Sequence, residues 1–322
     1  MKDQNNKTVN FIDLFAGIGG FRIAMEKAGA KCVFSSEIDR WACETYNKNF
    51  GEIPSGDIVK IDTSKIPDHD ILCAGFPCQS FSIGGYRKGF DDARGTMFFE
   101  VARILKGKKP LAFILENVRG ILNHDHGNTI KTIRDILNSL GYDFFESIIN
   151  AKDHGLPQNR ERWFCVGFRK ELRVSNFEFP KKKALRKTVY DLLEQNVEGH
   201  EMTKIAAMHV KNHYAQFASK PNTMTIASEI RPSRCVMKNN GISPCLTAKM
   251  GTGGNNVPVI VELERKFTVR ECLRLMGFPE HYKIKGDYHQ SYKQIGNSIP
   301  VPVAENIARQ VLKKIKHPLL QC

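Results

Sequence analysis

The sequence predicts an α/β protein with a doubly wound, mostly parallel sheet and a second, smaller domain rich in strands and loops. Over the first 180 residues, short apolar runs alternate with amphipathic stretches, which is typical of strands alternating with helices. Past Phe179 the composition changes, and residues 222–261 are rich in Thr, Ser, Gly, Pro and Asn without a helical period. A chain of 322 residues is long enough for both domains.

The order of the elements supports this fold class. The predicted strands of the large domain are residues 9–15, 31–36, 71–74, 111–115, 144–149 and 163–168, and the predicted helices are residues 21–28, 40–49, 96–105 and 129–140. Such alternation favours parallel strands with helices on both faces. Later, Thr268 and Glu271 form the capping box of a helix that Gly277 ends. Residues 296–298 are predicted as a turn, and Pro302 as the first turn of a final helix.

The net charge of +14 is unevenly distributed along the chain. Residues 1–180 carry 25 Lys and Arg against 23 Asp and Glu, whereas residues 181–322 carry 23 against 11. A basic excess confined to one part of the chain indicates that this part binds a polyanion, and it favours nucleic acid. The alternative is a basic surface that only promotes solubility.

Cysteine usage and hydropathy exclude several classes of protein. The nine cysteines form no CxxC pair and no Cys/His cluster, so we expect reduced thiols, neither a disulfide framework nor a metal site. The first residues, MKDQNNKTVN, contain no apolar stretch typical of a secretory signal. No apolar run is long enough to cross a bilayer, so we expect a cytoplasmic protein without membrane contact.

A single cysteine stands at the mouth of a glycine- and serine-rich loop. The stretch from Asp70 to Gly85 reads DILCAGFPCQSFSIGG, with the stiff Pro77 directly before Cys78. Parallel strands carry their chemistry at their carboxyl ends, so this thiol is placed to attack a substrate. The ordinary alternative is a buried structural cysteine.

Two further groups stand near predicted strand ends. Glu116 follows the apolar run 111–115, which favours a protonated carboxyl group that could assist addition of a thiolate to an electron-poor heterocycle. Arg160 and Arg162 point to the same side of an extended segment and suit an oxyanion, a carbonyl oxygen or a phosphate. The alternatives are a solvated strand-end glutamate and a charged surface turn.

A glycine turn follows the first predicted strand. Gly17, Gly19 and Gly20 let the backbone approach a ligand closely, but Arg22 stands where a dinucleotide fingerprint requires glycine. Glu37, at the end of the second strand, can accept hydrogen bonds from a ribose hydroxyl pair. A nucleoside ligand without a pyrophosphate fits both observations, and S-adenosylmethionine is a common one.

Six motifs together carry a resemblance to a known family. They are DLFAGIGGF (13–21), GFPCQSFS (75–82), ENVRG (116–120), QNRER (158–162), RKFTVRECLRLMGFP (265–279) and GNSIP (296–300). In these motifs and their order the chain resembles the DNA (cytosine-5)-methyltransferases of the compact bacterial type found in restriction–modification systems. The resemblance implies the Rossmann-like fold of S-adenosylmethionine-dependent methyltransferases, with the smaller domain serving target recognition.

The resemblance also implies a mechanism and its residues. Cys78 matches the nucleophile that adds to C6 of a flipped-out cytosine, and Glu116 the residue that bonds N3 and the exocyclic amine. Arg162 matches the arginine that supports the base carbonyl, with Arg160 as a helper. The positions expected to bind S-adenosylmethionine are Phe15, Gly17, Gly19, Glu37, Ile38, Asp57, Ile58, Pro77, Asn297 and Ser298.

For DNA binding, the resemblance assigns a lid and a recognition segment. The expected contacts are Gln79, Ser82 and Arg94 in the loop after Cys78, and Arg231, Arg234, Thr247, Lys249, Gly253 and Gly254 in the smaller domain. We expect a discontinuous catalytic domain of residues 1–185 plus 291–322, and a target-recognition domain, including the hinge, of residues 186–290. The expected substrate is double-stranded DNA, bound by a monomer that acts beside a cognate restriction endonuclease without direct contact implied.

Two alternatives remain open at this stage. Cys245-Leu246-Thr247 stands where the family usually has a Thr-Leu pair, and it comes near the Cys-Phe-Thr signature of the related subclass that methylates cytosine in tRNA. The other alternative is a catalytically inactive DNA-binding homologue, against which the intact Cys78, Glu116 and Arg162 argue.

Overall fold

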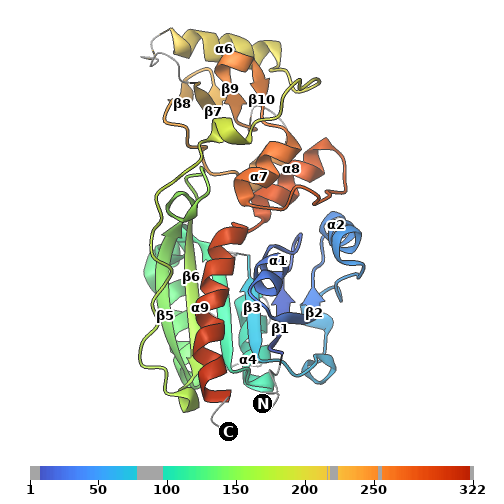
Figure 1. Ribbon diagram of the computed structural model, residues 1–322, viewed down its shortest axis with the longest axis vertical. Helices are drawn as coiled ribbons and strands as arrows, with labels where there is room; N and C mark the ends of the chain where they lie inside the picture. The colour runs from blue at the N-terminus through green and yellow to red at the C-terminus, as the bar shows by residue number, and fades with distance from the viewer. Residues whose placement is uncertain (1–7, 78–96, 216, 218–223, 253–255, 320–322) are drawn as a thin grey trace, which may run out of the picture.

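The structure is a computed structural model and describes residues 8–77, 97–215, 217, 224–252 and 256–319, with the side chains of residues 316–319 excepted. It contains two sheets, one above the other in Figure 1, with helices α7 (Val269–Met276) and α8 (Tyr288–Asn297) between them. In the described part of the chain, no helix is long and apolar enough to span a membrane.

The large sheet confirms the predicted fold class. Its six strands have the order β2-β1-β3-β4-β6-β5. The strands are β1 (Asn10–Leu14), β2 (Lys31–Ser36), β3 (Ile71–Gly75), β4 (Ala112–Val118), β5 (Tyr142–Asn150) and β6 (Glu161–Arg169). Strands β2, β1, β3 and β4 pair in parallel, whereas β6 is antiparallel to both of its neighbours. The reversal arises because β5 and β6 are joined by a short connection, whereas parallel strands need a crossover.

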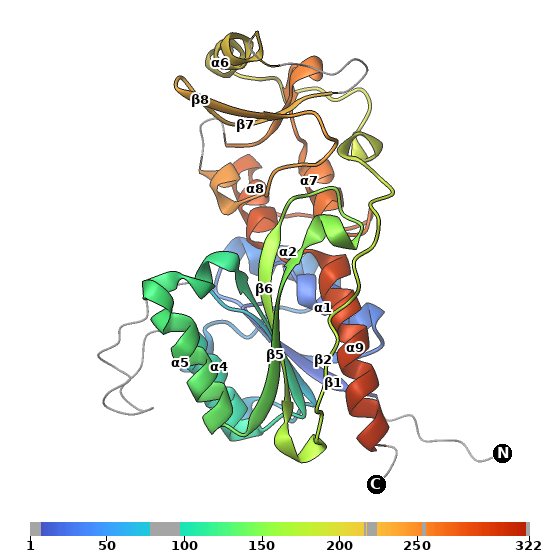
Figure 2. The same cartoon turned by 90° about the vertical axis from the view of Figure 1, so that its left-hand side faces the viewer.

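Helices cover both faces of this sheet, as Figure 2 shows. Helix α1 (Gly20–Lys27) and the long α9 (Val301–Leu319) pack together on one face, and α4 (Met97–Lys108) and α5 (Asn128–Ser139) cover the other. Successive residues of β3 point to opposite faces: Ile71 and Cys73 join the core under α1 and α9, while Leu72 and Ala74 join the core under α4 and α5. A strand buried on both faces reads as a continuous apolar run, which is why β3 could be predicted.

The second sheet is small and antiparallel. Its strand order is β10-β9-β7-β8, from β7 (Ile226–Arg231), β8 (Arg234–Lys238), β9 (Val259–Ile260) and β10 (Arg265–Lys266). Helix α6 (Lys204–Tyr214) covers it through a small core that includes Val210, Ala227 and Ile230. The predicted change to short strands and loops after the large domain is therefore confirmed.

The expected turn at residues 296–298 and the set of expected helices differ from the structure. Residues 296–298 are not a separate turn, because Gly296 and Asn297 form the last turn of α8. Neither α6 nor α8 was predicted. In α8, two of the five buried residues, Ser291 and Gln294, are polar, which obscures its apolar period. The expected domain boundary between residues 290 and 291 falls inside α8, and the division into domains stays a prediction.

Candidate active site

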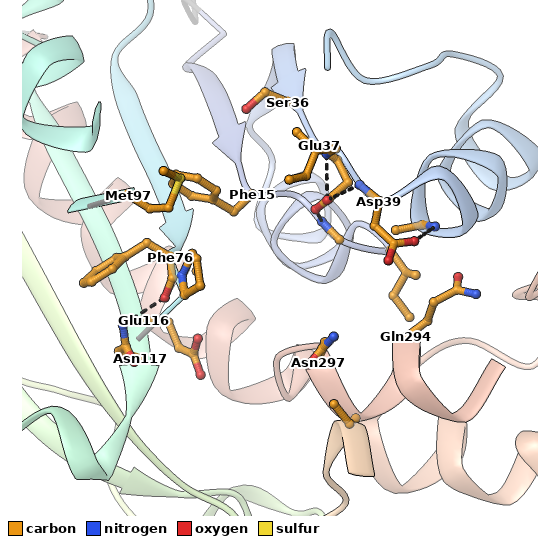
Figure 3. Close-up of a pocket in the computed structure, with 18 of the residues that line it drawn as sticks. Phe15, Ser36, Glu37, Asp39, Phe76, Met97, Glu116, Asn117, Gln294 and Asn297 are labelled. Atoms are coloured by element: carbon orange, nitrogen blue, oxygen red, sulfur yellow. Dashed lines mark hydrogen bonds between the residues drawn. The ribbon is translucent and has the colours of Figure 1, made fainter. Parts of the chain in front are cut away.

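A pocket of about 710 Å³ lies at the carboxyl ends of β1, β2, β3 and β4. In an open α/β sheet this edge is where ligands bind, because the loops that leave the strands diverge there. Figure 3 shows Glu116 and Asn117 on one side, Glu37 and Asp39 on the other, and Gln294 and Asn297 of α8 across from them. Helix α8 therefore forms one wall of this pocket, and the strand ends of the large sheet form the others.

The glycine turn and the end of β2 are tied together by one carboxylate. Oε2 of Glu37 accepts a hydrogen bond from the Gly17 amide at 2.8 Å, and Oε1 accepts from the amides of Ile38 and Asp39 at 2.7 and 2.8 Å. Asp39 in turn caps α2 (Arg40–Phe50) by accepting from the Trp41 and Ala42 amides. The carboxylate of Glu37 is thus held in one orientation at the pocket wall, with lone pairs left for hydroxyl donors.

Not every residue of the predicted cofactor set lines the pocket. Phe15, which lies on the wall, has a left-handed backbone with φ of 56°, a strained conformation for a bulky residue and one typical of ligand sites. Gly19 lies instead at the N-terminus of α1, where a Cβ atom would overlap the ring of Phe50. Ser298 is buried, with its hydroxyl close to Gly20, and does not line the pocket.

The remaining expected cofactor positions surround the open end of the pocket. Asp57 caps the short helix η1 (Ile58–Lys60) by accepting from the Val59 amide at 3.1 Å, which fixes the Ile58 side chain in the interior. Ile38 is 73 % exposed and forms an apolar part of the pocket wall. Pro77 and Asn297 both line the pocket and are exposed.

Glu116 and Arg162 meet at the other end. Glu116 pairs with Gly75 across β3 and β4, so the tips of these strands are neighbours, as predicted. Nε of Arg162 lies 3.0 Å from Oε1 of Glu116, and both side chains are about nine-tenths buried. Burial raises the pKa of Glu116, while the positive charges of Arg162 and, next, Arg160 oppose the rise. This confirms the direction that the apolar run before Glu116 predicted.

The structure also shows how the backbone before Cys78 is positioned. Nδ2 of the buried Asn117 donates to the carbonyl oxygen of Phe76 at 2.9 Å, and Oδ1 accepts from the Val118 amide at 2.8 Å. The end of β4 thereby holds the chain directly before Pro77 beside Glu116. Cys78 itself lies outside the described residues, as do Gln79, Ser82, Arg94, Gly253 and Gly254.

Arg160 has a different environment from Arg162. Its side chain is 1 % exposed. Nη1 donates to the carbonyl oxygen of Leu246 at 2.5 Å, and Nη2 donates to those of Gly296 and Ser298 at 3.0 and 2.5 Å. Burial, followed by the charge of Arg162, lowers the pKa of Arg160 to about 10. The guanidinium therefore joins three main-chain carbonyls of two distant segments. Arg160 also lines the pocket, and its expected help at the base carbonyl stays a prediction.

The predicted DNA-binding residues fall into two groups. Thr247 is exposed and lines the pocket, and Lys249 is exposed on the short helix η8 (Ala248–Gly251) beside α8. Arg231 and Arg234 are paired in the β7–β8 register and do not line the pocket. Arg234 forms an ion pair with Glu229 at 2.9 Å. Among the described members of this set, Thr247 is therefore the one that lines the pocket.

Several lining residues were not found from the sequence. They are Met97, Val118, Lys293 and Gln294. Gln294 accepts from the hydroxyl of Thr45 at 2.6 Å, and Lys293 contacts Asp39 at 3.2 Å, so both fasten α8 to α2. Within the described residues no cluster of His, Cys, Asp or Glu has the geometry of a metal site.

This fold and pocket define an α/β protein with a ligand-sized site at the carboxyl edge of its sheet. The sequence profile of the C-5 cytosine-specific DNA methylases matches residues 9–313. The chain belongs to this family and is a DNA (cytosine-5-)-methyltransferase.

Individual relatives agree with this assignment. The chain is 42 % identical over 318 residues to the Type II methyltransferase M.HhaI of Haemophilus parahaemolyticus, covering 97 % of this chain and 96 % of that protein. It is 44 % identical over 315 residues to M.DsaV of Dactylococcopsis salina, covering 96 % and 87 %. DNMT2 of Spodoptera frugiperda has a similar fold, with a TM-score of 0.71 at 22 % identity, covering 96 % and 100 %.

Proposed function

We propose that this enzyme transfers a methyl group from S-adenosylmethionine to C5 of a flipped-out cytosine in a short, specific duplex DNA sequence. We further propose that it is the modification enzyme of a restriction–modification system, and that it acts in the cytoplasm as a monomer beside a cognate endonuclease. The observation that carries the proposal is the Glu116–Arg162 pair, which shares one pocket with the carboxylate of Glu37.

The pocket suits S-adenosylmethionine. The fixed carboxylate of Glu37 offers acceptors for the two ribose hydroxyls, and Phe15, Ile38 and Ile58 offer apolar walls for an adenine ring. Asp57 and Asn297 add polar groups at the rim. When bound, S-adenosylmethionine supplies an electrophilic methyl group. Gly19 and Ser298 support this site without lining it.

The catalytic groups act on the cytosine. C5 of cytosine is a poor nucleophile until a thiolate adds to C6, and we assign this addition to Cys78. Protonated Glu116 donates to N3, so negative charge does not build up on the ring as the C6–S bond forms. Arg162 donates to the base carbonyl. After C5 has accepted the methyl group, a base removes the C5 proton, the C6–S bond breaks and N3 returns its proton to Glu116, which restores the aromatic ring, the thiolate and the carboxylic acid.

The arrangement requires the target base to leave the duplex. A pocket enclosed by strand ends on one side and α8 on the other cannot admit a stacked base pair, so the cytosine must be flipped out at a cost of a few kcal/mol. We assign contacts with the flipped nucleotide to Thr247, and sequence reading to the segment from Arg231 to Asn256.

Bisulfite sequencing of DNA from a host that expresses the protein tests this proposal. We expect protection of cytosine within one short sequence motif and no protection with the C78A variant. Transfer of labelled methyl groups to tRNA and not to duplex DNA would overturn the proposal in favour of the tRNA subclass. The Cys245-Leu246-Thr247 segment, which lies against Arg160 and Arg162, is the feature that motivates this comparison.

A further inference from the structure

A basic groove lies on the large domain, outside the catalytic pocket. It is formed by Lys181, Lys183, Arg186 and Lys187 of the segment that leads to the smaller domain, and by Arg309 and Lys313 of α9. None of these residues lines the catalytic pocket. Figure 2 shows this segment running along the side of the large domain past α9.

The groove consists of two adjoining hollows. One, of about 620 Å³, lies between the segment and α9 and contains Lys181, Lys183 and Lys313 in its walls. The other, of about 660 Å³, is lined by Lys183, Arg186 and Lys187 together with Gly155. Because Lys183 borders both hollows, the cations form one continuous strip instead of separate patches.

The backbone beneath the strip is anchored at both ends. Before it, the ring of Phe177 packs on Phe168 with centroids 5.7 Å apart and is buried in the core. After it, the Val189 amide donates to the carbonyl oxygen of Gly241 at 2.8 Å. In between, the Lys183 amide donates to the carbonyl oxygen of Asp153. The cations are therefore carried on a positioned chain, which lowers the entropic cost of binding an extended ligand.

Most of these charges have no carboxylate partner among the residues that the structure describes. Lys182 forms an ion pair with Asp153 at 3.2 Å, and Arg309 forms one with Glu305 at 2.8 Å. For Lys181, Lys183, Arg186, Lys187 and Lys313, the described part of the chain contains no ion pair with a carboxylate. Glu178 is a carboxylate on the groove wall. Uncompensated exposed cations on a fixed strip are available to a polyanion.

We infer that this groove is a second nucleic-acid contact, which binds backbone phosphates of double-stranded DNA away from the recognition sequence. Seven residues such as 181–187 can span up to roughly 20 Å, along which a duplex presents about a dozen phosphate charges. The strip also leads directly into the smaller domain, so DNA that extends beyond the catalytic pocket has a basic path to follow. The inference rests on the proposed DNA substrate, and it adds a sequence-independent contact that concentrates the enzyme on DNA.

The test replaces three uncompensated cations in the full chain, K181Q/K183Q/K187Q. Binding to a fluorescent duplex of about 40 base pairs without the target sequence is followed by anisotropy as the salt concentration is varied. We expect the slope of log Kobs against log salt to become less steep by up to about 2.7, and binding at low salt to weaken about tenfold or more. On a short duplex that ends close to the target, the single-turnover methylation rate should stay unchanged.

The matched control is K65Q/K106Q/K109Q, which removes the same charge from exposed positions elsewhere on the large domain. Equal salt slopes for the two variants would overturn the inference, since net charge alone would then explain binding. Loss of short-duplex methylation in the groove variant would also overturn it. Unchanged DNA binding by the groove variant, together with a lost affinity for immobilised polyglutamate, would overturn it too, because this result would indicate an acidic protein partner.

Failure of the proposed function is separate, since it would show as absent methylation in the wild type while the groove effect on DNA binding persists.

Discussion

The guanidinium of Arg162 lies 3.0 Å from the carboxyl group of Glu116 at the end of β4, and the pair is almost sealed from solvent. Burial raises the pKa of Glu116, and the arginine opposes that rise. Because the effect of burial exceeds that of the arginine, the carboxyl group can hold a proton at a pH where an exposed glutamate is ionised. In the mechanism that we propose, the pair therefore links proton donation at N3 to support of the base carbonyl.

We predict that R162Q lowers the single-turnover methylation rate about 100-fold, because a donor to the developing charge is lost. Without the nearby cation the pKa of Glu116 should rise further, so the fall in rate on the alkaline side should begin at higher pH than in the wild type. The matched variant is E116Q, which lacks the titrating group. An unchanged alkaline limb in E116Q would contradict the role of Glu116.

Arg160 should be a positioning residue. R160M leaves the carbonyls of Leu246, Gly296 and Ser298 without their donor, and we predict a loss of about 3 to 5 kcal/mol in the free energy of unfolding, measured with urea. The control, R40M, breaks an exposed pair with Glu44 and should cost less than about 1 kcal/mol. R160K should recover part of the loss. A small effect of R160M on stability with a large effect on rate would place Arg160 at the substrate instead.

Glu37 should determine the affinity for the cofactor. The carboxylate is held by the amides of Gly17, Ile38 and Asp39, and E37Q removes the charge that strengthens these bonds and any bond to ribose. We predict a dissociation constant for S-adenosylmethionine that is about 10- to 100-fold higher, measured by titration calorimetry. E44Q, on the exposed side of α2, is the control and should bind like the wild type. Equal affinities for E37Q and E44Q would refute the assignment.

A buried acid in β1 should shape the pH dependence of stability. Asp13 is fully buried, and burial raises its pKa to about 8, although the main-chain amide and the charge of Arg22 oppose the rise. The folded state then holds a proton that the unfolded state releases above about pH 4, so this group lowers the stability as pH rises from about 4 to 8. We predict that D13N gains roughly 3 to 4 kcal/mol relative to the wild type between about pH 5 and 8 in urea unfolding. The exposed D135N should show no such gain, and a D13N curve parallel to the wild type would count against the assignment.

The elements that could be predicted are those whose residue types alone indicate their environment. Strand β3 is apolar on both faces, and Thr268 and Glu271 form the capping box that starts α7. Helix α8 could not be predicted because the polar residues Gln294 and Ser291 are buried in it. Gln294 is buried with a hydrogen bond from Thr45, a contact that a hydropathy pattern does not reveal. Gly296 reads as a turn residue, yet it is required because a Cβ atom there would overlap the backbone of Thr247.

In the site, too, some residues could be predicted from the sequence and others could not. Glu37 and Glu116 could be found because strand ends in a parallel sheet meet at one edge. The division of labour between Arg160 and Arg162 could not, since two arginines spaced two residues apart look equivalent until the carbonyls that surround one of them are known. Asn117 was passed over because its function, holding the Phe76 carbonyl, depends on the register of β3 against β4.

The central claim is that Cys78 bonds to the target base during catalysis. It is tested most directly with duplex DNA that carries 5-fluorocytosine at the target position, because fluorine at C5 blocks the elimination that releases the enzyme. In the presence of S-adenosylmethionine the wild-type enzyme should form a covalent adduct that survives denaturing electrophoresis and maps to Cys78, and C78A should form none. Undiminished methylation of ordinary DNA by C78A, without an adduct in the wild type, would contradict the account.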